Sequence, residues 1–150
     1  MNINDLINLD LINLDCKATR KIDVLKTVAA MIHADERLHS QSGYYEGLIE
    51  RENQFSTGIG FGVAIPHAKS SAVKKASITV IRLNKSLDWE SIDDQPVDVI
   101  IGLAVPELNG GNTHLQIISK ISMQIMEKNF VENMRRAKSK EEILTLVSNI

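Results

Sequence analysis

Residues 97 to 105 read VDVIIGLAV and contain the longest uninterrupted run of apolar residues and glycine in the chain, residues 99–105. The stretch is short, rich in β-branched residues and bounded by turn residues, which is typical of a strand. Its residues are apolar almost throughout, a pattern found in strands that are covered on both faces. We therefore expect a central strand here, in a sheet that helices cover.

Other elements alternate with this strand along the chain. Strand patterns occur near residues 11–14, at 63–65 and at 76–83. Helical spacing of apolar residues occurs at 21–33, at about 41–52, from 113 to about 126, and at 141–147. The alternation predicts an α/β fold with one mixed β-sheet flanked by α-helices, in a single domain over residues 1–150.

An N-terminal cap is expected for three of these helices. Thr19 and Thr113 are placed to cap the helices that begin near residues 21 and 113. Ser139 and Glu142 have the spacing of a capping box before the last helix.

The composition is that of a globular protein. The chain has 150 residues, of which 43% are hydrophobic, and its formal net charge is −2. A near-neutral chain gives no reason to expect nucleic acid or an anionic membrane as a partner. The single cysteine, Cys16, excludes disulfide frameworks and thiolate zinc sites. The N-terminus is acidic and lacks a continuous apolar run, so we expect no signal peptide, no membrane insertion and a cytoplasmic location.

Residues 56 to 70, STGIGFGVAIPHAKS, place three glycines at alternate positions upstream of a histidine. Glycine is costly to order, so such a cluster marks a backbone segment with a required shape. The spacing fits neither of the common nucleotide-binding motifs. Val63 stands where a Walker A loop counted from Gly58 needs its second glycine and where a dinucleotide fingerprint needs its third.

His67 follows Pro66 at the end of the short strand expected at 63–65. Proline fixes its own φ and restricts the residue before it, so the histidine is held in a defined position. A neutral imidazole keeps a proton on one nitrogen and a lone pair on the other, which is the state needed to accept a phosphoryl group. From the pattern alone, a solvated loop histidine is the alternative interpretation.

Two further residues are candidates to act with His67. His114 opens the helix expected after the central strand, a position that favours anionic ligands, although a structural or solvated histidine is the alternative. Arg51 ends the helix expected over 41–52 and could stabilise phosphate oxygens, although an arginine there also complements the helix dipole. His33 and His39 do not have the spacing of a metal motif, and we expect no metal site.

The residues RENQFSTGIGFGVAIPHAKS (51–70) resemble the phosphorylation-site signature of the fructose/mannitol-type enzyme IIA domains of the bacterial phosphotransferase system (PTS). The resemblance continues through DQPVDVIIGLAVPE (94–107), THLQIISKIS (113–122) and RRAKSKEEI (135–143). It covers essentially the whole chain in the family's order and spacing. The fold that it implies is a mixed β-sheet flanked by helices, in agreement with the strand and helix patterns.

The resemblance implies a phosphotransferase that acts as a phosphoryl carrier in sugar transport. Such a carrier receives a phosphoryl group from the phosphocarrier protein HPr and passes it to an enzyme IIB component. The resemblance places the phosphoacceptor at His67, linked through Nε2, with Nδ1 hydrogen-bonded to a backbone carbonyl. It places the second active-site histidine at His114 and the active-site arginine at Arg51. No cofactor is implied, because the phosphoryl donor is a protein.

The resemblance also places Ser56 and Thr57 beside the site. We expect these two residues and Gly58 to bind phosphate, with the glycines of the segment forming an anion nest around the transferred group.

Two positions depart from the family's pattern. Phe61 stands where asparagine is common, and Ala68 stands where glycine is common. Neither change removes a group from the expected chemistry, so the departures bear on the choice of partner. Ile59, Phe61 and Val63 are candidates for the partner contact. Core packing is the alternative for these residues, and above all for Val63 and Ile65.

The same resemblance admits a second function. A regulatory protein of the nitrogen-related PTS branch would be phosphorylated by a nitrogen-branch paralogue of HPr and would signal through its phosphorylation state. Trp89, within LDWESIDDQPVD (87–98), favours the sugar branch.

Overall fold

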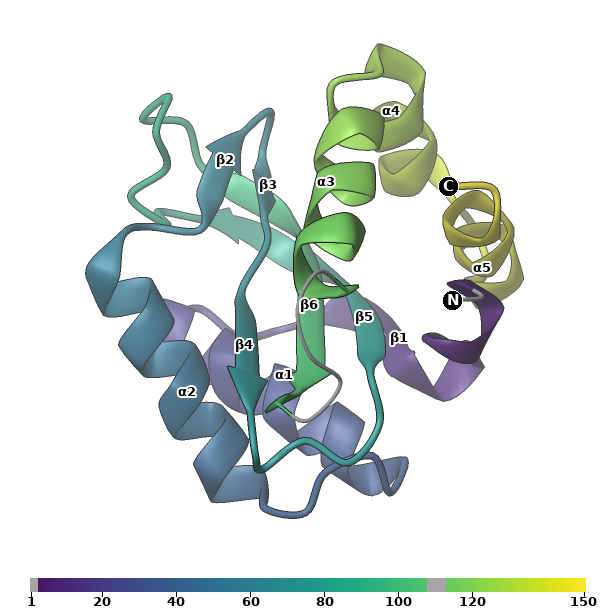
Figure 1. Ribbon diagram of the computed structural model, residues 1–150. Helices are drawn as coiled ribbons and strands as arrows, with labels where there is room; N and C mark the ends of the chain where they lie inside the picture. Colours follow the sequence, from purple (N-terminus) through teal and green to yellow (C-terminus); the bar gives the residue numbers. More distant parts are fainter. Residues whose placement is uncertain (1–2, 108–112) are drawn as a thin grey trace.

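A mixed six-stranded sheet forms the centre of the molecule (Figure 1). The computed structural model describes residues 3–107 and 113–150. Its strands are β1 (Ile12–Cys16), β2 (Gly58–Gly60), β3 (Val63–Ala64), β4 (His67–Ser70), β5 (Ser77–Leu87) and β6 (Val97–Pro106). The order across the sheet is β1-β5-β6-β3-β2, and β4 also pairs with β6. Because β6 is parallel to β3 and β4 but antiparallel to β5, the sheet is mixed, as predicted.

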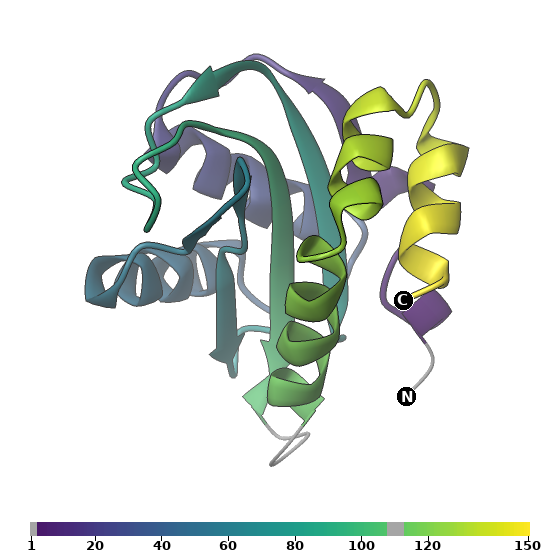
Figure 2. The same cartoon turned by 90° about the horizontal axis from the view of Figure 1, so that it is seen from above.

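Helices cover both faces of this sheet (Figures 1 and 2). They are α1 (Lys21–Ala34), α2 (Gln41–Gln54), α3 (Thr113–Ile125), α4 (Lys128–Arg136) and α5 (Lys140–Ser148), with the short 3-10 helices η1 (Ile3–Asp5) and η2 (Leu9–Leu11). α1 and α2 pack on one face, whereas α3 crosses the other, with α4 and α5 following it (Figure 2). Among the helices of the described residues, none combines the length and the apolar character that crossing a membrane requires.

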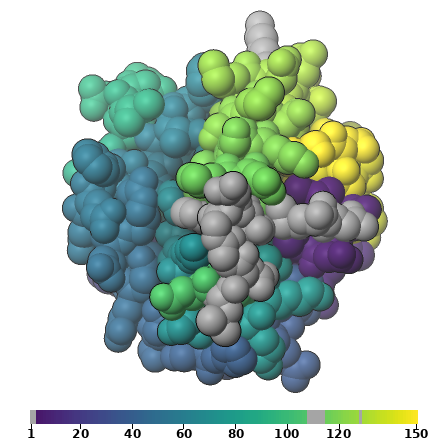
Figure 3. Space-filling model, viewed as in Figure 1, coloured from purple at the N-terminus to yellow at the C-terminus, as the bar shows by residue number. Residues whose placement is uncertain are grey.

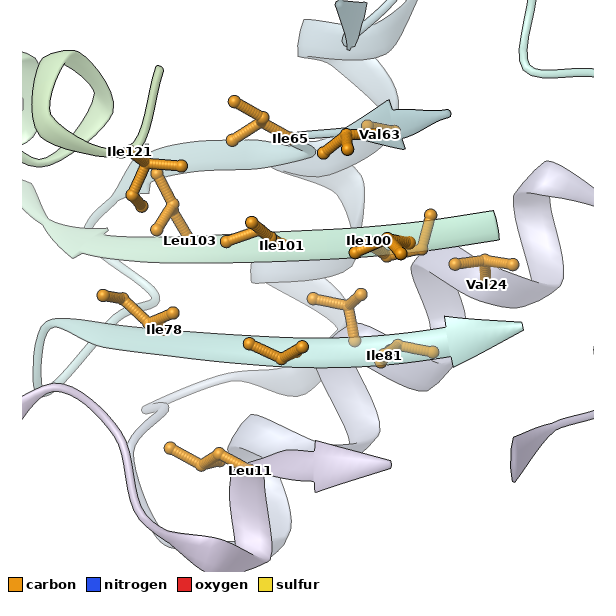
Figure 4. Packing of buried hydrophobic residues seen from close by; sticks show 14 of the residues in the cluster. Leu11, Val24, Val63, Ile65, Ile78, Ile81, Ile100, Ile101, Leu103 and Ile121 are labelled. Atoms are coloured by element: carbon orange, nitrogen blue, oxygen red, sulfur yellow. The ribbon is translucent and has the colours of Figure 1, made fainter. Parts of the chain in front are cut away.

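Branched aliphatic side chains build the core. Every residue of β6 except Asp98 is buried, as the sequence predicts for a strand covered on both faces. Figure 4 shows the side chains that β6 and its neighbours contribute, among them Ile65, Ile78 and Leu103. Full burial of one such side chain contributes about 1.5–3 kcal/mol, so the sheet is a rigid support for whatever its strands carry.

The predicted strands and helices are present, with ends that differ by a few residues. Among the strands and α-helices described, three were not predicted: β2, β4 and α4. β2 and β4 are short, and their residues do not alternate cleanly between apolar and polar. α4 carries many charged residues and begins without a side-chain cap hydrogen bond, so its first residue has no sequence signal.

Two of the three expected caps can be compared with the structure. Thr19 is not the N-cap of α1, because Arg20 holds that position with an extended backbone and no side-chain cap hydrogen bond. Ser139 caps α5 by accepting a hydrogen bond from the backbone N–H of Glu142, as predicted. The carboxylate of Glu142 accepts from the backbone N–H of Lys138, so the second half of the capping box is displaced by one residue. The expected cap at residue 113 depends on a side chain outside the described residues.

The hairpin of β2 and β3 turns through three consecutive residues with positive φ. Gly60 has a φ of 102°, Phe61 of 61° and Gly62 of 76°. Phe61 lacks glycine's freedom in this region, and the residue is 61% exposed. Arg135 holds the turn, since it donates to the carbonyl oxygen of Phe61 and forms an ion pair with Asp98 at 2.9 Å. A Cβ atom at Gly62 would displace the Arg135 guanidinium from its present position, and the positive φ favours glycine there.

α2 approaches β4 closely where Gly47 faces Ala68. A Cβ atom at Gly47 would lie 3.1 Å from the Cβ atom of Ala68. Ala68 is buried, and it is not among the described residues with positive φ, so alanine is accommodated without backbone strain at this position. The pair therefore sets the distance between α2 and the strand on which His67 lies.

Replacing Phe61 with asparagine should stabilise the protein. Asparagine tolerates the left-handed region, whereas a bulky residue there loses roughly 1 kcal/mol, so we expect a gain in unfolding free energy of about that size. Urea unfolding of Phe61→Asn measures it. Phe55→Asn is the matched control, because Phe55 is 76% exposed but has an extended φ of −152°. An equal change in both variants would contradict the strain at Phe61.

Gly47→Ala and Ala68→Gly should be energetically coupled. Alanine improves helix propensity at position 47 by about 1 kcal/mol, but its methyl group presses on Ala68. Removing the Ala68 methyl group relieves that pressure, so Gly47→Ala should be more favourable by roughly 1 kcal/mol in the Ala68→Gly background. A double-mutant cycle of unfolding free energies gives the coupling. Strictly additive effects would show that α2 moves freely away from β4.

Candidate functional site

His67 opens β4 and lies opposite Leu103 of the buried strand β6. The backbone N–H of Leu103 donates to the carbonyl oxygen of Pro66 at 3.0 Å, so the residue before the histidine is fixed to the sheet. On the other side, the Tyr44 hydroxyl of α2 donates to the carbonyl oxygen of Leu103 at 2.6 Å. Burial raises the pKa of Tyr44, so this hydroxyl remains a donor. Leu103, the β6 residue opposite His67, is therefore held by hydrogen bonds at both its N–H and its carbonyl group.

The imidazole of His67 has a defined tautomer. Its Nδ1 atom lies 2.8 Å from the carbonyl oxygen of Ile65. A carbonyl oxygen can only accept a hydrogen bond, so Nδ1 carries the proton and the lone pair of the neutral ring is on Nε2. The side chain is half-buried, and this geometry suits nucleophilic attack through Nε2.

A surface hollow with a volume of about 290 Å³ adjoins His67. Its described lining comes from α2 and β4: Gly47, Glu50, Arg51, Gln54, His67, Ala68 and Lys69. In the space-filling view of Figure 3, α2 forms the left side of the face and α3 lies above and to the right. The hollow therefore brings two cations, Arg51 and Lys69, to the histidine, together with one carboxylate, Glu50.

The position of Arg51 is compatible with both roles expected from the sequence, which are capping the helix end and binding phosphate oxygens. Its Nη1 atom donates to the carbonyl oxygen of Phe55 at 2.8 Å, just past the C-terminus of α2, where a cation complements the helix dipole. The same side chain lines the hollow beside His67. The capping contact engages one nitrogen of a guanidinium that has five N–H donors, so capping and anion binding are compatible.

Ser56 and Thr57 use their side chains within the protein. The Ser56 hydroxyl donates to the carbonyl oxygen of Trp89 at 2.9 Å and accepts from the backbone N–H of Gly58 at 3.1 Å. The Thr57 hydroxyl donates to Glu52 and accepts from the indole N–H of Trp89 at 3.2 Å. None of the three residues expected to bind phosphate is among the described residues that line the hollow. Phosphate binding by Ser56, Thr57 and Gly58 stays a prediction.

The glycine turn at Gly60 and Gly62 lies away from His67. β3 starts at Val63, which pairs with Val99, whereas His67 pairs with Leu103 four residues further along β6. At roughly 3.3 Å per strand residue, the two levels are about 13 Å apart. Gly60 and Gly62 form the hairpin turn that Arg135 holds. An anion nest of these glycines around the phosphoryl group stays a prediction.

His114 lies in the first turn of α3, and its side chain is outside the described residues. Of the expected site residues, the structure therefore brings together His67 and Arg51. His33 and His39 lie together at another surface hollow, lined also by Lys26 and Tyr45. Within the described residues there is no cluster of three or more metal-binding side chains.

Two residues that bear on the site, Lys69 and Glu52, were missed from the sequence. Lys69 follows His67 by two positions in a strand, which places both side chains on one face, and this signal was available. Glu52 accepts hydrogen bonds from Thr57 and Lys21, and no local pattern indicates that pairing. Of the partner-contact candidates, Val63 is buried in the core, and Phe61 is exposed.

Several known proteins are similar to this chain over nearly its whole length. It is 30% identical to the fructose-specific PTS EIIA component of Haloferax volcanii, over 99% of this chain and 96% of that protein. It is also 30% identical to the nitrogen regulatory protein of Bradyrhizobium diazoefficiens, over 99% of this chain and 95% of that protein. The fructose-specific EIIABC component of Bacillus subtilis is 31% identical, and the chain spans 23% of its length.

Solved structures share the fold. The nitrogen regulatory protein IIA-Ntr of Neisseria meningitidis matches with a TM-score of 0.90 at 31% identity, over 97% of this chain and 98% of that one. The mannitol IIA of Escherichia coli matches with a TM-score of 0.79 at 20% identity, over 94% of this chain and 98% of that one.

The family described as "Phosphoenolpyruvate-dependent sugar phosphotransferase system, EIIA 2" matches residues 5–150. With the sheet order, the helices on both faces and a histidine held at the start of β4, this match shows that the chain belongs to the PTS EIIA type-2 family, the fructose/mannitol-type phosphotransferase components.

Proposed function

We propose that this chain is a phosphoryl carrier of sugar uptake, which accepts a phosphoryl group from HPr on Nε2 of His67 and passes it to an enzyme IIB component. The observation that carries the proposal is the hydrogen bond from Nδ1 of His67 to the carbonyl oxygen of Ile65, which puts the lone pair on Nε2. In the reaction, Nε2 forms a bond to phosphorus while the bond from phosphorus to the HPr histidine breaks. The electron pair of the broken bond stays on the HPr imidazole, which takes up a proton from solvent and leaves as the neutral ring. A cytoplasmic location belongs to the same proposal.

The hollow supplies charge for this transfer. In the transition state, the phosphoryl group spreads negative charge over its equatorial oxygens. Catalysis of the transfer consists mainly of positioning and electrostatic stabilisation. Arg51 and Lys69 line the hollow beside His67 and give it an excess of positive charge over Glu50. We assign Arg51 to the phosphoryl oxygens, and His114 to the same oxygens by family resemblance. Ser56, Thr57 and Gly58 are proposed as phosphate-binding residues, as expected from the sequence.

Transfer onward is proposed to use the same face. The mannitol IIA of Escherichia coli is known in a complex with phosphorylated mannitol IIB, and this chain matches that structure with a TM-score of 0.82 at 18% identity. For the present chain, an acceptor IIB docking over the hollow would meet His67 from the side open to solvent. Such a contact must be released after each transfer, which favours a small interface.

A regulatory role in the nitrogen branch is the second candidate. It is favoured by the TM-score of 0.90 and 31% identity with the IIA-Ntr of Neisseria meningitidis. Trp89, which favoured the sugar branch in the sequence, is fully buried, and its indole N–H donates to Thr57. Its presence is therefore explained by packing and does not separate the two branches.

Phosphorylation of His67 is directly measurable. Incubation with phosphoenolpyruvate, enzyme I and HPr should add one phosphoryl group to the wild type, detected by intact-mass spectrometry, and none to His67→Ala. His33→Ala, which removes an exposed histidine of α1, should be phosphorylated like the wild type. Phosphorylation of His67→Ala would refute the assignment. Transfer from a nitrogen-branch paralogue of HPr but not from HPr would make the regulatory role the better one.

Loss of Arg51 should slow the transfer without unfolding the protein. Removal of one preorganised donor to a developing anion typically lowers the rate by a factor on the order of 100, and we expect this for Arg51→Ala. Arg51→Lys should retain part of the rate, because the charge stays while the planar fork of donors is lost. Arg136→Ala is the control, since Arg136 is 80% exposed on α4. Quench-flow measurement of phosphoryl acceptance at matched folded fraction tests this; equal rates for Arg51→Ala and the control would exclude the role.

A further inference from the structure

Glu52 is a buried carboxylate near the end of α2, and its side chain is only 5% exposed. It accepts a hydrogen bond from the backbone N–H of Thr57 at 2.8 Å and another from the Thr57 hydroxyl. Lys21 of α1 supplies the countercharge, with its Nζ atom 3.2 Å from the carboxylate. The ammonium group also lies 5.3 Å from the centre of the Trp89 ring. Every polar group in this cluster therefore has a partner.

A continuous series of hydrogen bonds leads from this cluster to His67. The carboxylate of Glu52 accepts from the backbone N–H of Thr57, and the carbonyl oxygen of Thr57 accepts from the backbone N–H of Ile65 at 2.9 Å. The carbonyl oxygen of Ile65 in turn faces Nδ1 of His67 at 2.8 Å. Thr57 and Ile65 each use both the N–H and the C=O group of their backbones in this series.

Both intermediate residues lie outside regular elements. Thr57 belongs to the connection between α2 and β2, and Ile65 to the short break between β3 and β4. Neither position is fixed by a helix, and Ile65 is not part of a strand. Glu52 is itself in the last turns of α2, a rigid element that also lines the hollow through Arg51. The Glu52 carboxylate therefore connects two parts of the site. Through Thr57 it fixes the Ile65 carbonyl oxygen, which selects the tautomer of His67, relative to α2, the helix that carries Arg51.

We propose that Glu52 is a positioning residue for the phosphoacceptor, which acts through the backbones of Thr57 and Ile65 to hold His67 in the tautomer with its lone pair on Nε2. Only the expected effect of Glu52 on phosphoryl transfer rests on the proposed function. Its effect on the tautomer of His67 is a property of the unphosphorylated protein.

The tautomer can be read without any phosphoryl donor. Long-range ¹H–¹⁵N correlation spectra of ¹⁵N-histidine-labelled protein, recorded at a pH where His67 is neutral, distinguish Nδ1–H from Nε2–H by the two ring-nitrogen shifts. The wild type should show the Nδ1–H form. Glu52→Ala leaves the Thr57 N–H without its acceptor, so Ile65 shifts and both tautomers should be populated. The rate of acceptance from phospho-HPr should fall about 10- to 100-fold, as expected for a small displacement of a reacting group.

Two variants separate positioning from stability. Glu52→Gln retains an oxygen that can accept from the Thr57 N–H, so the Nδ1–H form should be recovered. Asp35→Ala is the matched control, because it removes a carboxylate that accepts from Arg37 at 2.7 Å and from Asn8 at 2.9 Å, with no hydrogen bond to Thr57 or Ile65. It should lower the unfolding temperature while the His67 spectrum remains that of the wild type.

If Glu52→Ala fails to fold, the double variant Lys21→Met/Glu52→Leu replaces it. Removing both charges avoids an unpaired buried charge, and such replacements commonly leave proteins folded. It still removes the acceptor for Thr57, so the mixture of tautomers should persist. Wild-type His67 spectra in Glu52→Ala, or in the double variant where that is used, would overturn the proposal. Failure of the wild type to accept a phosphoryl group would refute the proposed function instead, and the spectra would still decide the role of Glu52.

Discussion

Pairing of the chain from Val63 to Ser70 with β6 is the constraint on which the rest of the site depends. β6 is buried along nearly its whole length, so its register cannot slip without exposing the core. β3 and β4 pair one after the other with the same side of β6, and Ile65 and Pro66 interrupt the strand between them. Proline lacks an N–H group, and its carbonyl oxygen still accepts from Leu103. The break therefore keeps the pairing while freeing the Ile65 carbonyl oxygen to face the imidazole.

The two ends of the segment from 56 to 70 have different structural roles: one forms a hairpin turn and the other positions His67. At the hairpin end, positive φ values and the Arg135–Asp98 ion pair fix a tight turn. At the histidine end, the backbone of Ile65 and the approach of α2 fix a side chain. Gly60 and Gly62 belong to the hairpin turn, even though they precede the histidine in sequence. Their effect on His67 is indirect, because the turn determines where β3 begins to pair with β6.

Much of this arrangement could be predicted from the sequence, but not its side-chain partners. The central strand and the long helices have strong periodicity, and the position of His67 after Pro66 follows from local restrictions on the backbone. Pairings between distant residues have no such local signal. Thr57 was expected beside the phosphate, yet its hydroxyl and its N–H are both used by Glu52, an acceptor in the preceding helix turn. Arg51 could be assigned to the helix end or to the hollow, and the structure shows that it contacts both.

The buried pair of Lys21 and Glu52 is better explained by geometry than by stability. Taking two charges from water carries a desolvation penalty that their attraction offsets only when the remaining hydrogen bonds are satisfied, and an apolar pair of similar volume is often as stable. An apolar side chain at position 52 could fill the space that the carboxylate occupies. It could not accept a hydrogen bond from Thr57, and that residue would then lose its fixed position relative to the helix. Because Ile65 hydrogen-bonds to Thr57 and His67 faces Ile65, a polar residue in the core is the simplest way to link the phosphoacceptor to a rigid helix.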